Sequence, residues 1–130
     1  PPPALLAGVR IAAAAAAMVD VPLRVAAPHL PDDCTGQFSH PTYLEITPSG
    51  VDKAVGLEQL GRQLGISPGE MAAIGDGEND LGMLRAVGLG IAMANAPSHV
   101  RRAAKKITAS NDQEGVAIAI KRILADLQKE

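Results

Sequence analysis

Aromatic residues are nearly absent from this chain of 130 residues, which has one Phe, one Tyr and no Trp. A hydrophobic core must therefore be built from Ala, Leu, Ile and Val. Neither sign of charge predominates, because the chain has 12 Lys and Arg residues and 14 Asp and Glu residues, which give a net charge of −2. A scattered, slightly acidic charge argues against nucleic acid or an anionic membrane as the main partner.

Cysteine and long hydrophobic runs are equally scarce. With Cys34 as the only cysteine, no disulfide can form within the chain. That fits a reducing compartment, and we expect a cytoplasmic protein. The apolar run Ala4–Val19 is broken by Gly8 and Arg10 and is shorter than the roughly 20 residues of a membrane-spanning helix. We interpret it as a buried helix; a cleaved signal peptide is the alternative, which the lack of a basic leading segment disfavours.

Hydrophobic and charged residues make up 47% and 20% of the chain, which is ordinary globular usage and argues against wholesale disorder. The chain opens with three prolines rather than Met, and we expect a processed product or a natural or engineered fragment.

In the first part, the pattern predicts a helix over Ala4–Val19, a strand over Leu23–Ala27, a loop through Pro28, Pro31, Asp32, Asp33 and Gly36, and a half-buried strand over Tyr43–Thr47.

From Lys53 onward the pattern changes to a regular alternation of helix and strand. Apolar residues recur at helical spacing up to Leu64, and Gly65 is a plausible helix stop. The uniformly apolar segment Met71–Ile74 predicts a strand buried on both faces. The expected elements that follow are a helix over Leu81–Val87, a strand over Leu89–Met93, a helix from Pro97 to about Lys105, a strand over Ile107–Ala109 and a helix over Gly115–Gln128. Repeated units of this kind predict an α/β fold, a parallel sheet with helices on its faces.

The segment after the first of these strands carries the chemistry. Asp76 is the first polar residue beyond the strand, where ligands gather in open α/β sheets. Gly75 and Gly77 permit a tight turn and a close approach of the backbone to a ligand. Asn79 and Asp80 lie at the start of a helix, where their side chains can cap it. Mg²⁺ prefers carboxylate oxygens and phosphate favours helix N-termini, so the pattern indicates a magnesium–phosphate site. The alternative is purely structural, because turns and caps use the same residue types.

Three segments extend this interpretation through resemblance to a known family. The segment Gly75–Leu84, with the sequence GDGENDLGML, resembles the fourth motif of the haloacid dehalogenase (HAD) superfamily. The segment Leu44–Lys53 is similar to the strand and loop that bring in the motif III lysine of Cof-like sugar phosphatases, and the spacing to the fourth motif matches. Gly90–Ala96 and Asn111–Val116 are similar to the later strand and the entry to the terminal helix in that subfamily. The resemblance covers about Tyr43 to Leu127.

This resemblance implies a Mg²⁺-dependent phosphohydrolase acting on a small-molecule phosphate ester, such as a sugar phosphate. In such enzymes an aspartate attacks the phosphoryl group, and water hydrolyses the resulting aspartyl-phosphate. By resemblance, Lys53 neutralises the nucleophile and the phosphate, and Asp76 ligates Mg²⁺ directly. Asp80 is expected to support the metal through water or to orient Lys53, and Asn79 to help hold the phosphate.

The nucleophile motif itself, Asp-x-Asp-Gly-Thr, is not in the sequence, and neither is a convincing second motif. The nearest imitation, Asp32–Gly36, follows His29-Leu-Pro31 rather than a buried strand. The resemblance therefore implies that residues 1–47 are the tail of an α/β cap domain. It also implies that residues 48–130 are the C-terminal half of the HAD core, a Rossmann-like parallel sheet with helices on both faces. The chain alone is then expected to be inactive.

The missing strand has a consequence for assembly. In the HAD core the strand of the first motif lies beside the one that ends at Gly75. We therefore expect self-association through an exposed sheet edge, or association with the missing N-terminal part. The alternative to the enzyme is a non-catalytic α/β module or assembly fragment with residual metal or phosphate binding.

Overall fold

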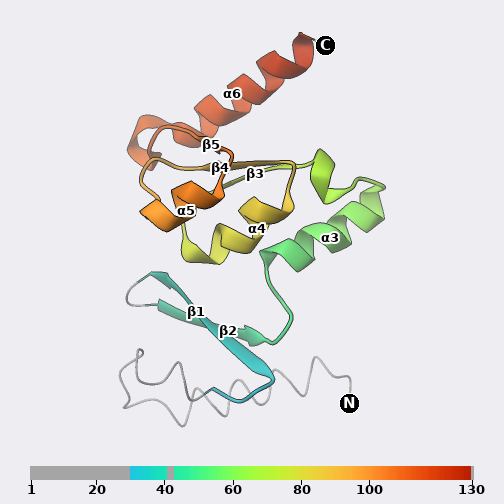
Figure 1. Cartoon of the computed structure of the whole chain (residues 1–130), viewed down its shortest axis with the longest axis vertical. Coiled ribbons are helices and arrows are strands. Elements are labelled where there is room, and N and C mark those ends of the chain that lie inside the picture. The colour runs from blue at the N-terminus through green and yellow to red at the C-terminus, as the bar shows by residue number, and fades with distance from the viewer. Residues whose placement is uncertain (1–29, 41–42, 130) are drawn as a thin grey trace. The chain divides into compact units, whose positions relative to one another are not determined.

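The computed structural model describes residues 30–40 and 43–129 (Figure 1). The helix expected over Ala4–Val19 and the strand expected over Leu23–Ala27 lie outside these residues. The chain divides into two compact units, Pro1–Asp52 and Lys53–Glu130. The assignment of residues 1–47 to a cap and 48–130 to a core stays a prediction. Within the described residues, no helix combines the length and the apolar character that crossing a bilayer requires.

The described part of the first unit is an antiparallel β-hairpin. Strand β1 (Cys34–His40) pairs with β2 (Tyr43–Pro48), so that Cys34 lies opposite Pro48. Strand β2 confirms the strand expected over Tyr43–Thr47. The loop expected to extend through Gly36 is wrong, because the turn ends at Asp33 and Gly36 lies inside β1. The glycine serves packing, since a Cβ atom there would lie 2.5 Å from Cδ1 of Leu30.

The second unit contains the alternating helices and strands that the sequence predicts. In chain order they are α3 (Lys53–Leu64), β3 (Ala72–Gly75), α4 (Leu81–Ala86), β4 (Leu89–Ala92), α5 (Ser98–Ala103), β5 (Lys106–Ile107) and α6 (Gly115–Gln128). Short 3₁₀ turns at Pro68–Glu70, Glu78–Asp80 and Asn111–Gln113 precede β3, α4 and α6. The bounds of α6 match the prediction, as do the end of α3 at Leu64 and the starts of α4 at Leu81 and β4 at Leu89; the remaining ends differ by one or two residues.

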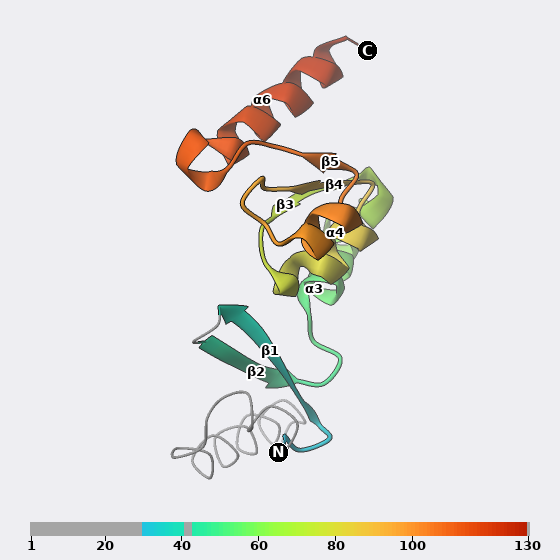
Figure 2. The same ribbon diagram turned by 60° about the vertical axis from the view of Figure 1, so that its left-hand side comes forward.

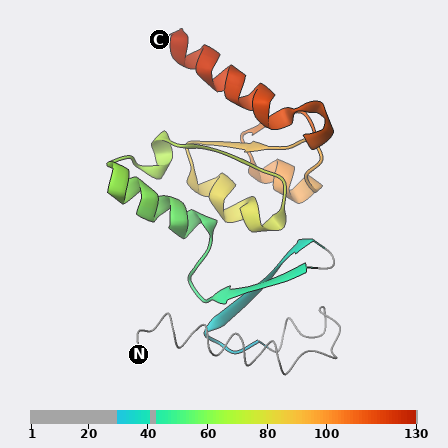
Figure 3. The ribbon, with the colours of Figure 1, turned by 180° about the vertical axis from the view of Figure 1, so that it is seen from behind.

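The three strands form one parallel sheet in the order β3-β4-β5. Ala73 lies opposite Gly90, and Ile91 lies opposite Lys106. Helices α3, α4 and α5 lie on one side of the sheet and α6 lies on the other, as Figures 2 and 3 show from two further directions. This confirms the predicted Rossmann-like arrangement with helices on both faces.

The core of this unit lies between the sheet and helices α4 and α5. Four buried residues form its centre: Leu84, Ala92, Ala96 and Val100. Helix α4 approaches β4 so closely that a Cβ atom at Gly90 would collide with the carbonyl oxygen of Leu84. The sheet and helix therefore pack at a distance that only glycine permits.

Strand β3 is not buried on both faces, which corrects the prediction for Met71–Ile74. Ala73 and Gly75 are buried, whereas Ala72 is exposed and Ile74 is half-buried. The reason is the position of α6, which lines a groove together with residues of β4 and β5 but none of β3. One face of β3 is therefore left open in the described part of the chain.

Candidate active site

Asp76 lies where the sequence analysis placed it, directly after the carboxyl end of β3. Its side chain is exposed. The chain then passes Gly77, enters the 3₁₀ turn Glu78–Asp80 and continues straight into α4. The site thus lies at the carboxyl ends of the parallel strands, where open α/β folds bind their ligands.

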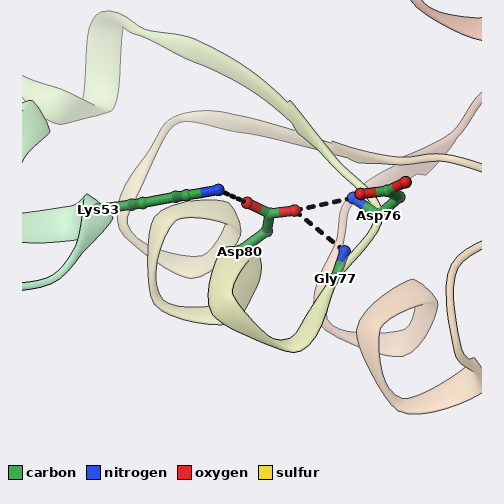
Figure 4. A network of polar contacts seen from close by, with 4 residues as sticks. All are labelled: Lys53, Asp76, Gly77 and Asp80. Carbon is green, nitrogen blue, oxygen red and sulfur yellow. Dashed lines mark hydrogen bonds and ion pairs between the residues drawn. The ribbon is translucent and has the colours of Figure 1, made fainter. Parts of the chain in front are cut away.

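Asp80 is the buried centre of this site, with only 4% of its surface exposed. Its Oδ2 atom accepts hydrogen bonds from the backbone amides of Asp76 and Gly77, at 2.9 and 3.0 Å (Figure 4). Its Oδ1 atom accepts a hydrogen bond of 2.5 Å from Nζ of Lys53, the first residue of α3. The Asp80 carboxylate therefore binds both the backbone of the Asp76 loop and the Lys53 ammonium.

The expected capping role of Asp80 is realised differently from the prediction. Its side chain makes no capping hydrogen bond to α4 and turns back to the amides that precede the 3₁₀ turn. The third residue of such a turn can reach back in this way, as it does in a capping box. The side chain therefore holds the loop that precedes the 3₁₀ turn instead of bonding to the amides of α4.

The charge state of Asp80 follows from these contacts. Burial raises its pKa, but the hydrogen bond from Lys53, those from the Gly77 and Asp76 amides and the Lys53 charge together hold the pKa below its ordinary value. Asp80 is therefore a carboxylate at neutral pH. The Lys53 side chain remains 49% exposed, and its ammonium has three N–H donors, so it can bind a further anion while it contacts Asp80.

The two glycines of the motif provide space rather than unusual backbone angles. Among the described glycines, only Gly50 and Gly65 have a positive φ, so the conformational freedom expected for Gly75 and Gly77 is not used. A Cβ atom at Gly75 would lie 2.6 Å from Cγ of Asp80. At Gly77 it would lie 2.7 Å from Oδ1 of Asn79. The close approach is therefore to the site's own side chains.

Asn95 is a further polar residue at the carboxyl ends of the strands, and it was not among the residues predicted from the sequence. It follows the end of β4 as Asp76 follows the end of β3, and that parallel placement was the signal available. Its Nδ2 atom lies 3.5 Å from Oδ2 of Asp76. Its Oδ1 atom accepts a hydrogen bond of 3.0 Å from the backbone amide of Asn111. The segments after all three parallel strands therefore meet beside Asp76.

The donor set can be tested against a magnesium ion. Within the described ranges, no group of three or more His, Cys, Asp or Glu side chains could hold a metal. Mg²⁺ is commonly bound by one or two carboxylates, with substrate phosphate and water completing its shell. The exposed carboxylate of Asp76 suits that kind of site, whereas both oxygens of Asp80 are engaged by Lys53 and the loop amides. The residues present fit a magnesium ion that takes one carboxylate from this chain.

The haloacid dehalogenase-like hydrolase family matches residues 23–120. This chain belongs to that family. A HAD subclass IIB sugar phosphatase of solved structure superposes with a TM-score of 0.69 and 33% identity, over 77% of this chain and 38% of that one. The family and fold predicted from the sequence are confirmed.

Curated relatives carry more than one kind of name. A putative phosphatase of Haemophilus influenzae is 37% identical over 102 residues, which is 78% of this chain and 37% of that protein. A protein named endoribonuclease YBEY, chloroplastic, of Arabidopsis thaliana is 49% identical over 79 residues, which is 61% of this chain and 14% of that protein. This HAD chain therefore spans well under half the length of these relatives.

Proposed function

We propose that this chain is the C-terminal part of a Mg²⁺-dependent phosphohydrolase that acts on small phosphorylated metabolites, with sugar phosphates as the leading class. The observation that carries the proposal is the buried Asp80 carboxylate, which joins the Lys53 ammonium to the loop that presents Asp76. Phosphoryl transfer requires positive charge close to the phosphoryl oxygens, from a cationic side chain and from a metal ion held by a protein carboxylate. Lys53 offers the cation and Asp76 the metal ligand, both at the carboxyl ends of the parallel strands.

Each side chain has a role that its contacts support. Lys53 binds and neutralises phosphate oxygens with the N–H donors that Asp80 does not use. Asp76 is the direct ligand of Mg²⁺, which when bound supplies Lewis-acid stabilisation of the phosphoryl oxygens. Asp80 is a positioning residue for Lys53 and for the Asp76 loop. Asn79, half-buried beside Gly77, helps to hold the phosphate.

The nucleophile must come from outside this sequence, which has no Asp-x-Asp-Gly-Thr motif. We propose that residues 48–130 supply half of the catalytic core and residues 1–47 the tail of a cap. The short coverage of the relatives and of the solved sugar phosphatase supports this arrangement. The 130-residue chain by itself should then lack phosphatase activity, because it cannot form the aspartyl-phosphate.

The test compares a longer protein that carries this chain and the first motif with the 130-residue chain. The longer protein should hydrolyse p-nitrophenyl phosphate and sugar phosphates with Mg²⁺ and lose this activity in chelator. The 130-residue chain should show no turnover. A rate near 1 s⁻¹ or above, in the ordinary range for enzymes, would contradict the proposal that the chain lacks the nucleophile. If the longer protein also fails to turn over any phosphate ester, the alternative of a non-catalytic module with residual binding takes precedence.

A further inference from the structure

Asn95 occupies a position between the loops that follow the parallel strands. It lies in the segment after β4, and its amide group lies between the Asp76 carboxylate and the backbone of Asn111. Asn111 begins the 3₁₀ turn that precedes α6. The amide of Asn95 is therefore the described side chain that links the Asp76 loop to the segment after β5.

The orientation of this amide group is fixed by its stronger contact. A backbone N–H can only donate, so the Asn95 atom that faces the Asn111 amide at 3.0 Å must be the oxygen. The NH₂ group is then turned toward Oδ2 of Asp76, at 3.5 Å. That second bond is long and exposed, and it adds little to the stability of the fold. Its direction is nevertheless set by the first.

The backbone around Asn95 is also held from both sides. The amide of Met93 donates to the carbonyl oxygen of Gly75 at 2.9 Å, and the amide of Ala94 donates to that of Ala109 at 3.4 Å. These bonds continue the sheet contacts beyond the ends of the strands. The N–H donor offered to Asp76 is therefore preorganised by the neighbouring strands.

We propose that Asn95 is a positioning residue that orients the Asp76 carboxylate for the cation. The inference rests on the proposed function, because it takes Asp76 as the metal ligand. Hydrogen bonds to a ligating carboxylate restrict its orientation, and removing such a partner lowers metal affinity or activity by about 10- to 100-fold. Asparagine suits this position, since an aspartate would set a second negative charge against Asp76 and could not donate to it.

The experiment uses the longer protein that carries this chain, with Mn²⁺ as the probe and electron paramagnetic resonance to measure the unbound ion. Asn95→Leu removes both polar atoms at similar volume, and Asn95→Gln keeps an amide. Gln113→Leu is the matched control, because Gln113 is an exposed polar residue of the same 3₁₀ turn as Asn111. Asn95→Leu should weaken Mn²⁺ binding about 10-fold or more, Asn95→Gln should restore part of it, and the control should stay within about twofold. The Tm without metal should stay close to the wild-type value in all variants, because the Asn111 amide that loses its Asn95 partner is exposed and can bond to water instead.

The outcomes separate the two proposals. If wild-type protein binds Mn²⁺ and Asn95→Leu binds it as well as the control does, the inference about Asn95 is overturned and the proposed function stands. A loss of affinity that comes with a lower metal-free Tm, and that Asn95→Gln does not restore, would assign Asn95 a structural role and also overturn the inference. If wild-type protein does not bind Mn²⁺, the proposed function fails and the inference fails with it.

Discussion

Among the single residues of the site, Asp80 determines the local geometry. Its carboxylate accepts hydrogen bonds from Lys53 and from two loop amides while almost fully buried. Replacing it with Asn removes the charge and turns an NH₂ group toward one of these donors. Hydrogen bonds to a charged group contribute about 1.5 to 3 kcal/mol each, and a buried donor left unsatisfied costs about 1 to 3 kcal/mol. We expect Asp80→Asn to lower the free energy of unfolding by at least about 2 kcal/mol at neutral pH, measured by urea denaturation.

The same residue predicts a dependence on pH. Because the pKa of Asp80 is lower in the folded than in the unfolded chain, its contribution is fully present above the unfolded value of about 4. It is lost as the pH falls through the lower, folded pKa. The difference in unfolding free energy between wild type and Asp80→Asn should therefore shrink in acid. Asp126→Asn, at an exposed ion pair on α6, is the control and should change little at any pH. A difference that stays constant into strong acid would contradict the charged state of Asp80.

At this scale, the sequence predicts residues within one motif better than contacts between distant parts of the chain. Asp76 could be placed because it directly follows an apolar strand. Lys53 and Asp80 are 27 positions apart, and only the family resemblance joined them. Asn95 was missed because a lone asparagine in a loop is an ordinary residue there. Its significance depends on which strands are neighbours, which one sequence does not state.

At the scale of elements, close contacts between backbone segments set where helices can lie. Gly90 of β4 faces the carbonyl oxygen of Leu84 in α4, and a methyl group would push the helix away. We expect Gly90→Ala to destabilise the protein by about 1 to 3 kcal/mol, the usual cost of overpacking. Urea denaturation and Tm measure this effect.

The matched control is Gly56→Ala in the interior of α3, where nothing lies within 4 Å of the added Cβ atom. That variant should be more stable than wild type by about 0.5 to 1 kcal/mol, because alanine favours a helix over glycine. If both variants change stability in the same direction, the close contact between α4 and β4 is not what requires Gly90.

The elements of the second unit were the most predictable. Helix α6 has its apolar residues at helical spacing and was predicted with its bounds, because no other element competes for that pattern. Strand β1 was missed, since Gly36 is typical of loops and its packing against Leu30 cannot be known from the sequence. The open face of β3 was missed for a similar reason: burial depends on which helix covers the strand.

At the scale of the whole molecule, apolar surface remains uncovered in the described residues. Strand β3 has no neighbour on its outer edge in the described part of the sheet. Helix α6 also exposes four large apolar side chains, each by 46 to 61%: Val116, Ile120, Leu124 and Leu127. Edges and patches of this kind promote association with another chain. A longer protein that paired a further strand with β3 would cover this edge.

We therefore predict that the 130-residue chain self-associates through the β3 edge at micromolar concentration, unless the N-terminal part of the core that we propose is bound to it. Analytical ultracentrifugation measures this. Ala72→Lys places a charge on the exposed face of β3 and should weaken the association. Leu124→Lys on α6 is the control, which should weaken it less. A monomer with a cooperative melt would contradict the exposed edge.

The central claim is that Asp76 holds the cation of a phosphatase, and kcat/KM for p-nitrophenyl phosphate in the longer protein tests it most directly. In saturating Mg²⁺, Asp76→Ala should lower kcat/KM by at least about 100-fold, because the metal contributes several kcal/mol of transition-state stabilisation. Asp126→Ala removes an exposed carboxylate from α6 and should leave kcat/KM within about twofold. Unchanged turnover in Asp76→Ala, or full activity of the wild type in chelator, would contradict the account.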